Sequence, residues 1–280
     1  MPIYRPQELR DFLNQIGMSP RKNLSQNFLI DRNVIKKTLD TASLTEDDWV
    51  VEIGPGPGAL TESLLEANAH VYAIEKDRDL APVLQRFDPS EQKLKVSCCD
   101  VLTFSFEEEL QNWLPKGRKA KLIANLPYHL TTPILETLAP LSHLFHSLTV
   151  MVQDEVAQRF VAKPRTKEYG SFTLFLRYYG QPTYSFKVSR NCFYPPPKID
   201  SAITHIPLAE PAFPVGPESF FKVTRRAFQQ RRKTLRSSLK DTFGVDAVLQ
   251  ALKQMNLPEE SRPEELSFEQ FLELAQLINT

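Results

Sequence analysis

The sequence has few cysteines, and their positions do not suit a disulfide framework or a zinc site. Of the three, Cys98 and Cys99 are adjacent, and Cys192 lies far along the chain. This arrangement gives neither an even set of bridges nor the paired spacing of zinc ligands. We therefore expect reduced, structural thiols and no bound metal.

Long apolar runs are missing as well. No stretch approaches the roughly 18 consecutive apolar residues of a membrane-spanning helix, and the first residues lack the apolar segment of a signal peptide. Hydrophobic residues make up 41% and charged residues 24% of the 280 positions, which is ordinary for a globular protein. We expect a cytoplasmic protein with no membrane partner, and a monomer.

Net charge is also absent, with 34 basic and 34 acidic residues. The balance conceals two opposed blocks near the end of the chain. Residues 222–240 hold eight basic residues and no acidic one, whereas residues 241–280 hold eight acidic residues against Lys253 and Arg262. A local basic surface is therefore compatible with the neutral total.

Short apolar runs alternate with helical stretches, which predicts an α/β fold with a parallel sheet. The predicted strands are residues 49–53, 70–74, 94–98, 121–124 and 148–152, followed by 183–188 and 201–206. The predicted helices are residues 6–16, 32–41, 59–67, 77–87, 131–141, 155–161 and 170–179. Asp31 is expected to cap the helix over 32–41.

A proline-rich segment divides the chain. Residues 207–217 contain four prolines in eleven residues, a density that neither helix nor strand tolerates. The sequence therefore predicts a large domain over 1–206, a linker over 207–217 and a small all-α domain over 218–280. Helices are expected there over 220–239, 245–255 and 268–278.

Glycines gather directly after the first predicted strand. Three of only nine glycines, Gly54, Gly56 and Gly58, stand between that strand and a helix. Such a loop lets a ligand approach the backbone and the positive end of the helix. The spacing also fits the pattern of nicotinamide dinucleotides, so it predicts a nucleotide-like cofactor without choosing one.

Carboxylates end the next two strands. Glu75 is suited to the hydroxyls of a ribose, and Asp100 to the amino group of an adenine. Each has a plainer interpretation, as a solvated carboxylate at a helix start or as a helix cap. Their coincidence at one sheet edge favours a ligand pocket.

The fourth strand runs into the tetrapeptide Asn125, Leu126, Pro127 and Tyr128. An exocyclic amino group on an aromatic ring is a poor nucleophile, because its lone pair is spread into the ring. If the Asn125 amide oxygen and a loop carbonyl accept its two hydrogens, the lone pair can be aimed at an electrophile. Tyr128 could stack on the ring, although a turn with a buried tyrosine would give the same sequence.

Several segments together resemble the KsgA/RsmA family of ribosomal RNA adenine N6,N6-dimethyltransferases, over nearly the full chain. They are residues 26–31, residues 51–56, the strand ends at Glu75 and Asp100, residues 125–128 and residues 193–201. The resemblance implies a Rossmann-like class I methyltransferase fold over 1–206 with a helical C-terminal domain. It implies methyl transfer from S-adenosylmethionine, with S-adenosylhomocysteine as product, to adenosines of 16S small-subunit RNA, two adjacent ones being dimethylated.

The resemblance also implies roles for individual residues. Asn27, Leu29, Gly54, Glu75, Asp100 and Asn125 would bind the methyl donor. Phe193 would face Tyr128 across an extruded adenine. Apart from the resemblance, the basic block predicts that flanking phosphates meet Arg225, Arg232 and Arg236, on one face of a helix over 220–239. Arg21 and Lys22 could add positive charge near the pocket. The plainer interpretation of the basic helix is a solvated face paired with the acidic tail.

Other functions stay open on sequence alone. They are a large-subunit RNA methyltransferase of the antibiotic-resistance type, a DNA adenine methyltransferase, a non-catalytic ribosome assembly or transcription factor, and a nicotinamide oxidoreductase. The partner expected from the resemblance is small-subunit RNA or a partly assembled 30S subunit.

Overall fold

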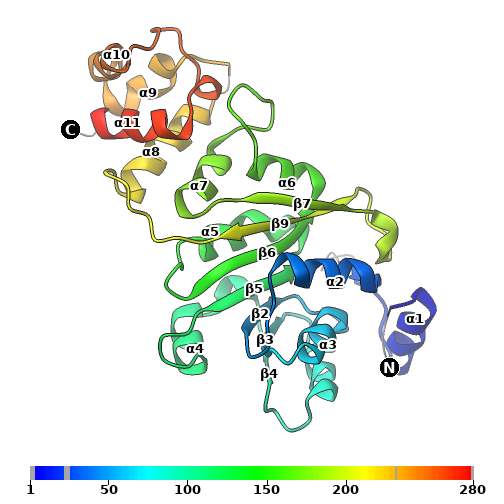
Figure 1. Cartoon of the computed structure of the whole chain (residues 1–280). Helices are drawn as coiled ribbons and strands as arrows, with labels where there is room; N and C mark the ends of the chain where they lie inside the picture. The colour runs from blue at the N-terminus through cyan, green and yellow to red at the C-terminus, as the bar shows by residue number, and fades with distance from the viewer. Residues whose placement is uncertain (1–3, 22–25, 231, 279–280) are drawn as a thin grey trace. The chain divides into compact units, whose positions relative to one another are not determined.

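The structure, a computed structural model, describes residues 4–21, 26–230 and 232–278 (Figure 1). Its internal contacts divide it into two compact units. The first unit comprises the chain up to Ala157 together with Thr183–Ala209, and the second, helical unit comprises Gln158–Pro182 and the chain from Glu210 onward.

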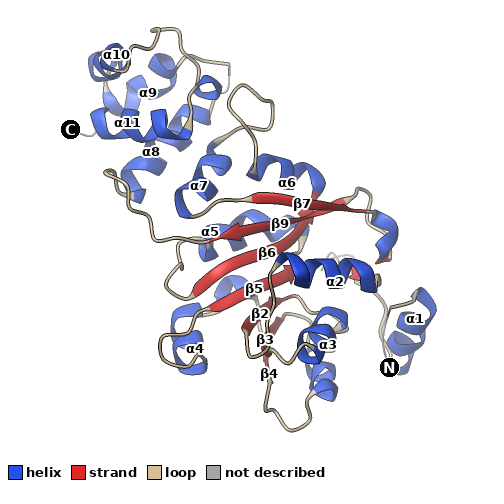
Figure 2. Cartoon of the chain, viewed as in Figure 1, coloured by secondary structure: helices blue, strands red, loops and turns tan. Residues whose placement is uncertain are grey.

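The first unit is built on a seven-stranded sheet (Figure 2). Its order is β4-β3-β2-β5-β6-β9-β7. The strands are β2 (Trp49–Ile53), β3 (His70–Glu75), β4 (Leu94–Cys98), β5 (Ala120–Asn125), β6 (Phe145–Gln153), β7 (Thr183–Val188) and β9 (Ser201–Pro207). The first five are parallel, and β7 and β9 run antiparallel. The α/β class and all seven predicted strands are confirmed.

The order of the strands reverses at β2, which lies between β3 and β5. In open parallel sheets, ligands bind beyond the carboxyl ends of the strands at such a point. The glycine loop follows β2, Glu75 is the last residue of β3, Asp100 comes shortly after β4, and Asn125 is the last residue of β5. The topology therefore brings the predicted pocket residues to one edge.

The helices of this part of the chain are α1 (Pro6–Gln15), α2 (Arg32–Thr41), α3 (Ala59–Glu66), α4 (Phe106–Trp113), α5 (Thr131–Leu138) and α6 (Asp154–Phe160). Asp31 caps α2 as expected, since its Oδ1 accepts the N–H groups of Asn33 and Val34 at 2.9 and 3.1 Å. The helix α4 was not predicted.

The α-helix predicted over 77–87 is wrong. The chain forms a turn after Asp77 and then a 3₁₀ helix, η2 (Ala81–Phe87). The Asp77 carbonyl accepts from both Leu80 and Ala81, and Pro82 has no N–H to donate. The α-helical pair between Ala81 and Asp77 therefore cannot be continued by the next residue.

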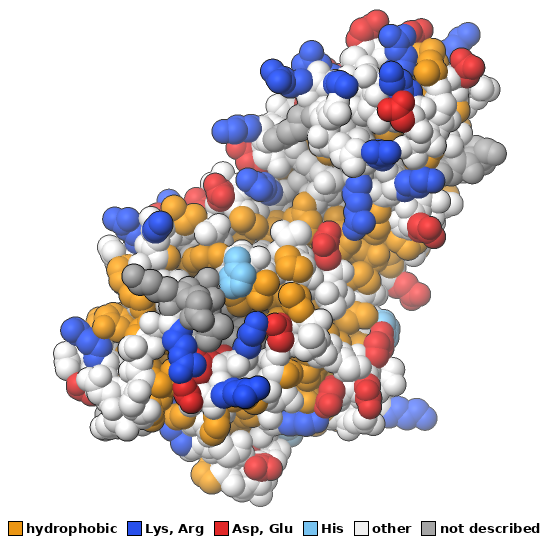
Figure 3. Space-filling view, turned by 180° about the vertical axis from the view of Figure 1, so that it is seen from behind, with side chains coloured by type: hydrophobic (Ala, Val, Ile, Leu, Met, Phe, Trp, Pro, Cys, Tyr) orange, Lys and Arg blue, Asp and Glu red, His pale blue; other side chains and the backbone are white. Residues whose placement is uncertain are grey.

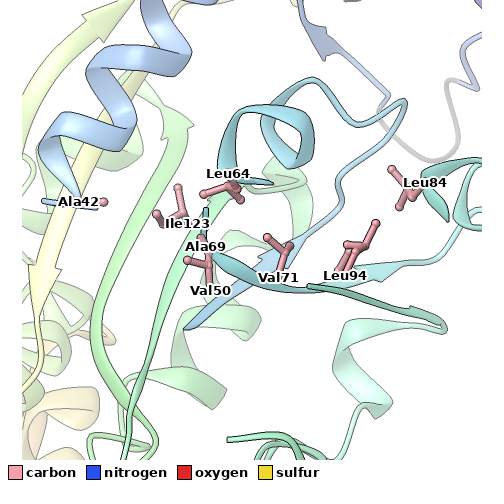
Figure 4. Close-up of a cluster of buried hydrophobic side chains, with 9 residues drawn as sticks. Ala42, Val50, Leu64, Ala69, Val71, Leu84, Leu94 and Ile123 are labelled. Atoms are coloured by element: carbon pink, nitrogen blue, oxygen red, sulfur yellow. The ribbon is translucent and has the colours of Figure 1, made fainter. Parts of the chain in front are cut away.

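The centre of the sheet is buried on both faces, because consecutive residues of β2 and β3 are excluded from solvent. Figure 4 shows an apolar cluster that packs on it. Val50, Val71 and Ile123 from three neighbouring strands lie in one apolar cluster with Leu64 of α3 and Leu84 of η2, all fully excluded from solvent. This explains why the strands read as nearly continuous apolar runs. It also makes the strand ends a rigid base for the pocket.

The helical unit contains α7 (Ser171–Tyr179), α8 (Pro217–Phe228), α9 (Leu235–Phe243), α10 (Val245–Gln254) and α11 (Phe268–Ile278). The structure groups α7 with the C-terminal helices, whereas the boundary expected from sequence put it in the large domain. Aromatic rings are the cause: Tyr178 stacks on Phe220 of α8 with centroids 5.0 Å apart, and Phe175 lies 5.1 Å from Phe221. Because the contacting residues are far apart in sequence, no local pattern predicts these contacts.

The single helix predicted over 220–239 is also wrong, because α8 ends at Phe228 and α9 begins at Leu235. The hydroxyl of Thr234 caps α9 by accepting the Ser237 N–H at 3.3 Å, and the Leu235 N–H donates to the Ser261 carbonyl.

None of the helices in the described ranges combines the length and apolar character needed to cross a membrane.

Candidate active site

A cavity lies in the first unit at the carboxyl ends of the parallel strands. Nine residues predicted for the site line it: Asn27, Leu29, Gly54, Glu75, Asp100, Asn125, Leu126, Pro127 and Tyr128. They come from segments spread over one hundred positions of the chain. The structure therefore brings together most of the predicted site.

The glycine loop forms one wall of this cavity. Gly54 and Gly56 have φ values of 66° and 58°, in the left-handed region that residues with a Cβ adopt rarely. A Cβ on Gly56 would also come within 2.9 Å of the Phe28 ring. Glycine is required here both for the turn and for the close approach of Phe28.

Glu75 is held beside this loop by the backbone. Its Oε2 accepts the Gly56 N–H at 2.9 Å and its Oε1 accepts the Asp77 N–H at 2.8 Å. Burial raises the pKa of the Glu75 carboxyl, and the two backbone hydrogen bonds oppose that rise. Each oxygen keeps a further lone pair, so the carboxylate can still accept hydroxyl donors from a ligand.

Glu52, the one charged residue in β2, also lines the cavity. Its side chain is buried, and its Oε2 accepts the Thr61 hydroxyl of α3 at 2.7 Å. Burial, reinforced by the nearby charge of Glu75, raises the pKa of Glu52 to about 8. Glu52 is thus mainly protonated at neutral pH. It was not predicted as a site residue, although a lone charge in an apolar strand was a usable signal.

Asp100 serves two structural contacts at the cavity edge. Its Oδ1 accepts the Leu102 N–H at 3.0 Å, which caps the short helix η3 (Val101–Thr103), and its Oδ2 pairs with Lys76 Nζ at 2.7 Å. The Lys76 hydrogen bond is the largest of the causes that lower the pKa of Asp100. Asp100 therefore both caps η3 and lines the cavity.

The loop after β5 is fixed at several points. Asn125 Nδ2 donates to the Asn27 carbonyl at 3.4 Å. Because the nitrogen of the amide is used in this way, its oxygen is the group left to accept a hydrogen bond. The Pro127 carbonyl accepts the Leu130 N–H at 2.9 Å. The Leu126 carbonyl is therefore the better candidate for a second acceptor.

Tyr128 lies half-buried in the same loop. Its hydroxyl is hydrogen-bonded to that of Ser201 at 2.7 Å, and burial raises its pKa. The ring is thereby fixed at the cavity wall. An aromatic face in this position can stack on a planar ligand.

Phe193 occupies a different place from the one expected. It belongs to the two-residue strand β8 (Phe193–Tyr194), which pairs with β1 (Phe28–Leu29). Its side chain is only 2% exposed and packs with Met151, Val188 and Ile203, so it is not among the residues that line the cavity. Its contact with a base stays a prediction. The β1–β8 pair was missed because two residues carry no periodicity.

The predicted basic residues lie on different elements of the helical unit. Arg225 lies on α8, Arg232 in the connection that follows, and Arg236 on α9, so a single helical face is wrong. Arg236 pairs with Glu259 at 3.3 Å. Figure 3 shows basic side chains spread over the helical unit with acidic ones among them.

Near the cavity, Arg21 is engaged by acidic partners and forms ion pairs with Asp77 and Asp79. Lys22 lies outside the described residues. Within the described ranges, no group of three or more histidine, cysteine or acidic side chains is placed to hold a metal ion.

Comparison with known proteins adds a decisive observation. The family described as ribosomal RNA adenine dimethylase matches residues 17–280. The chain belongs to this family. Membership makes the protein an enzyme, a methyltransferase of ribosomal RNA adenines. It does not favour the oxidoreductase, DNA methyltransferase or non-catalytic alternatives that the sequence left open.

Individual relatives are similar over nearly their full length. The chain is 54% identical to ribosomal RNA small subunit methyltransferase A of Protochlamydia amoebophila, covering 98% of this chain and 96% of the relative. It is 43% identical to the protein of the same name from Chlamydia caviae, covering 98% of both.

Solved structures agree with the class I methyltransferase fold. A dimethyladenosine transferase from Plasmodium falciparum superposes with a TM-score of 0.74 at 25% identity, covering 88% of this chain and 95% of that one. The 23S rRNA methyltransferase ErmE superposes with a TM-score of 0.67 at 26% identity, covering 91% of this chain and all of ErmE.

Proposed function

We propose that the protein transfers methyl groups from S-adenosylmethionine to the N6 amino groups of adenosines in small-subunit ribosomal RNA, dimethylating two adjacent adenosines. The observation that carries this proposal is the amide oxygen of Asn125, which accepts no hydrogen bond from the described residues and lines the same cavity as the buried, backbone-held Glu75. The names of the relatives at 43–54% identity support the small subunit as target.

The cavity residues fit an adenosine-containing donor. Glu75 can accept two ribose hydroxyls with its remaining lone pairs, and the glycine loop allows the ligand to approach the backbone beside it. Asp100 can accept an adenine amino group only alongside its contacts with Lys76 and Leu102, through spare lone pairs. Asn27 and Leu29 would cover the same ligand from the N-terminal segment.

When bound, the donor supplies an electrophilic methyl group on a sulfonium. The chain itself supplies alignment. Asn125 Oδ1 and the Leu126 carbonyl would accept the two hydrogens of the target amine and aim its lone pair, with Pro127 stiffening the loop. Tyr128 would stack on the extruded base, and Phe193 would support the wall through Met151 and Ile203.

The remaining parts of the proposal concern the RNA partner. Arg225, Arg232 and Arg236 would contact phosphates from α8, the connection after it and α9, in free small-subunit RNA or in a partly assembled 30S subunit. Arg21 is less suited to this role, since two carboxylates already pair with it. We further propose that the protein acts as a monomer, in the cytoplasm where ribosomal subunits assemble.

The test uses the purified protein with labelled S-adenosylmethionine and undermethylated small and large ribosomal subunits. We expect label only in small-subunit RNA, recovered as N6,N6-dimethyladenosine at two adjacent positions. Label confined to large-subunit RNA would favour the activity named for ErmE. No binding of the donor and no label in either subunit would overturn the proposal.

A further inference from the structure

Asp77 is a buried carboxylate outside the set of residues that line the cavity. Its Oδ1 accepts Arg21 Nη1 at 3.0 Å and the Asp79 N–H at 3.0 Å. Its Oδ2 accepts Gln26 Nε2 at 2.7 Å. Gln26 Oε1 in turn accepts the Arg21 N–H at 2.7 Å. One carboxylate therefore holds two residues that lie more than fifty positions earlier in the chain.

The residues held in this way lead directly into the cavity wall. Asn27 follows Gln26, and its carbonyl accepts Asn125 Nδ2 at 3.4 Å. Phe28, next along, approaches Gly56 so closely that a Cβ there would have no room. The position of Gln26 thus sets where the N-terminal segment crosses the cavity.

Asp77 also touches the other side of the site. Its backbone N–H donates to Glu75 Oε1 at 2.8 Å, and Glu75 Oε2 accepts from the glycine loop. A single residue therefore joins the N-terminal segment to the carboxylate proposed to bind ribose. Hydrogen bonds to a charged group are directional and among the stronger ones in proteins.

After Gln26, the pairing of β1 with β8 fixes Phe28 and Leu29. Before Gln26, the contacts of helix α1 are less specific in direction. The helix α1 packs through Leu9 and Leu13 against Ile30 and Leu80 in an apolar cluster. Such packing fixes a segment on a surface but discriminates poorly between small sliding movements. The bonds from Asp77 are those that set the register of Gln26 relative to the cavity.

We propose that Asp77 is a positioning residue for the methyl donor, which keeps Asn27 and Leu29 across the cavity by holding Arg21 and Gln26. This inference rests on the proposed donor site. A purely structural role would be a local one, in which Asp77 only stabilises the turn through the Asp79 N–H.

The experiment compares Asp77→Asn with Asp79→Asn in the full chain. Asp79 is a matched control, because it pairs with the same Arg21 from an exposed position and does not contact Gln26. Donor affinity is measured by calorimetry, KM and kcat by methyl transfer, and hydrogen exchange at residues 28–30 with and without S-adenosylmethionine.

For Asp77→Asn we expect the Kd and KM of the donor to rise about ten-fold or more, as for the loss of a buried charged hydrogen bond, with kcat at saturating donor within about three-fold. Donor-dependent protection of residues 28–30 should be lost. For Asp79→Asn, we expect changes under about two-fold, because exposed ion pairs contribute little.

If Asp77→Asn does not fold, Gln26→Leu tests the same idea, since it removes the contact with Asp77 Oδ2 together with the bond that Gln26 Oε1 accepts from the Arg21 N–H. It should raise the donor Kd several-fold. An unchanged donor KM in a folded variant, or equal effects of the Asp77 and Asp79 changes, would overturn the inference. Failure of the wild-type protein to bind the donor would instead overturn the proposed function.

Discussion

The cavity of the first unit and the basic region of the helical unit use charge in opposite ways. At the cavity, Glu52, Glu75 and Asp77 are buried, and each is held by hydrogen bonds within the chain. In the basic region, formed by Arg225, Arg232 and Arg236, the Arg236 side chain is half exposed, and so is that of Glu259, with which it pairs. The cavity is therefore preorganised for one geometry, whereas the basic region can adjust to the position of a phosphate.

This contrast predicts that substitutions at the cavity reduce methyl transfer without weakening RNA binding, and that substitutions in the basic region do the converse. The largest effect should come from Asn125→Ala, which removes the free amide oxygen. We expect the rate of methyl transfer to fall by about a hundred- to a thousand-fold, as for the loss of a preorganised polar group. RNA affinity in a filter-binding assay should change less than about two-fold.

Asn112→Ala, on the exposed surface of α4, is the matched control and should keep full activity. Near-normal turnover of Asn125→Ala would contradict this prediction, because the Asn125 amide would then not be needed for methyl transfer.

The converse variant replaces Arg225, Arg232 and Arg236 together by glutamine. RNA binding should weaken, and the slope of log affinity against log salt should fall by about 0.7 to 0.9 for each lost phosphate contact. The Kd of the methyl donor should stay unchanged. Binding measured between low and physiological salt checks both statements.

The control for this variant replaces Lys116, Arg118 and Lys119, which precede β5 at the amino ends of the parallel strands, far from the cavity edge. With glutamine at these three positions, the control loses as much positive charge as the triple arginine variant. An equal drop in slope for both variants would mean that net charge, and not the helical unit, determines RNA binding.

A smaller effect concerns the stability of the cavity region. The folded-state pKa of Glu52, about 8, lies above its ordinary value of 4.5. Between these values the folded protein keeps a proton that the unfolded chain releases, so this residue makes the protein less stable as pH rises. Glu52→Gln should gain at least about 2 kcal/mol over wild type between pH 5 and pH 8, since one pKa unit corresponds to about 1.4 kcal/mol.

Urea unfolding of both proteins at the two pH values measures this difference. A gain that is the same at pH 5 and pH 8 would show that Glu52 ionises normally. The cavity would then be less dry than its burial indicates.

The smallest effect is expected for Tyr128→Phe. It removes the hydrogen bond to Ser201 and keeps the ring, so kcat/KM should fall by less than about five-fold. Tyr128→Ala, which also removes the stacking face, should cost about ten-fold or more. Equal losses in the two variants would assign the role to the hydroxyl and not to the ring.

Local patterns in the sequence were sufficient for the sheet and for most of the pocket. Apolar runs of strand length predicted every strand of the sheet, and each polar group that follows a strand was read directly from its position. Glycine at 54 and 56 was informative for the same local reason, since only the backbone conformation and one close neighbour decide it.

Contacts between distant segments were not predictable in this way. The pairing of β1 with β8 joins two dipeptides more than 160 positions apart, and Arg21 and Gln26 meet Asp77 across fifty positions. The break between α8 and α9 was missed because Leu235 donates to Ser261, a partner that no window on the basic helix contains.

By itself, the sequence determined the α/β class, the order of the strands along the chain and the chemical identity of the groups at their ends. These depend on residue periodicity and type, which act over a few positions. Only the tertiary structure decided that Glu52 is buried and that burial raises its pKa, that Phe193 lies behind the cavity wall and that Asp77 holds the N-terminal segment. Burial and long-range hydrogen bonds arise when remote segments exclude water together, and that condition exists only in the folded chain.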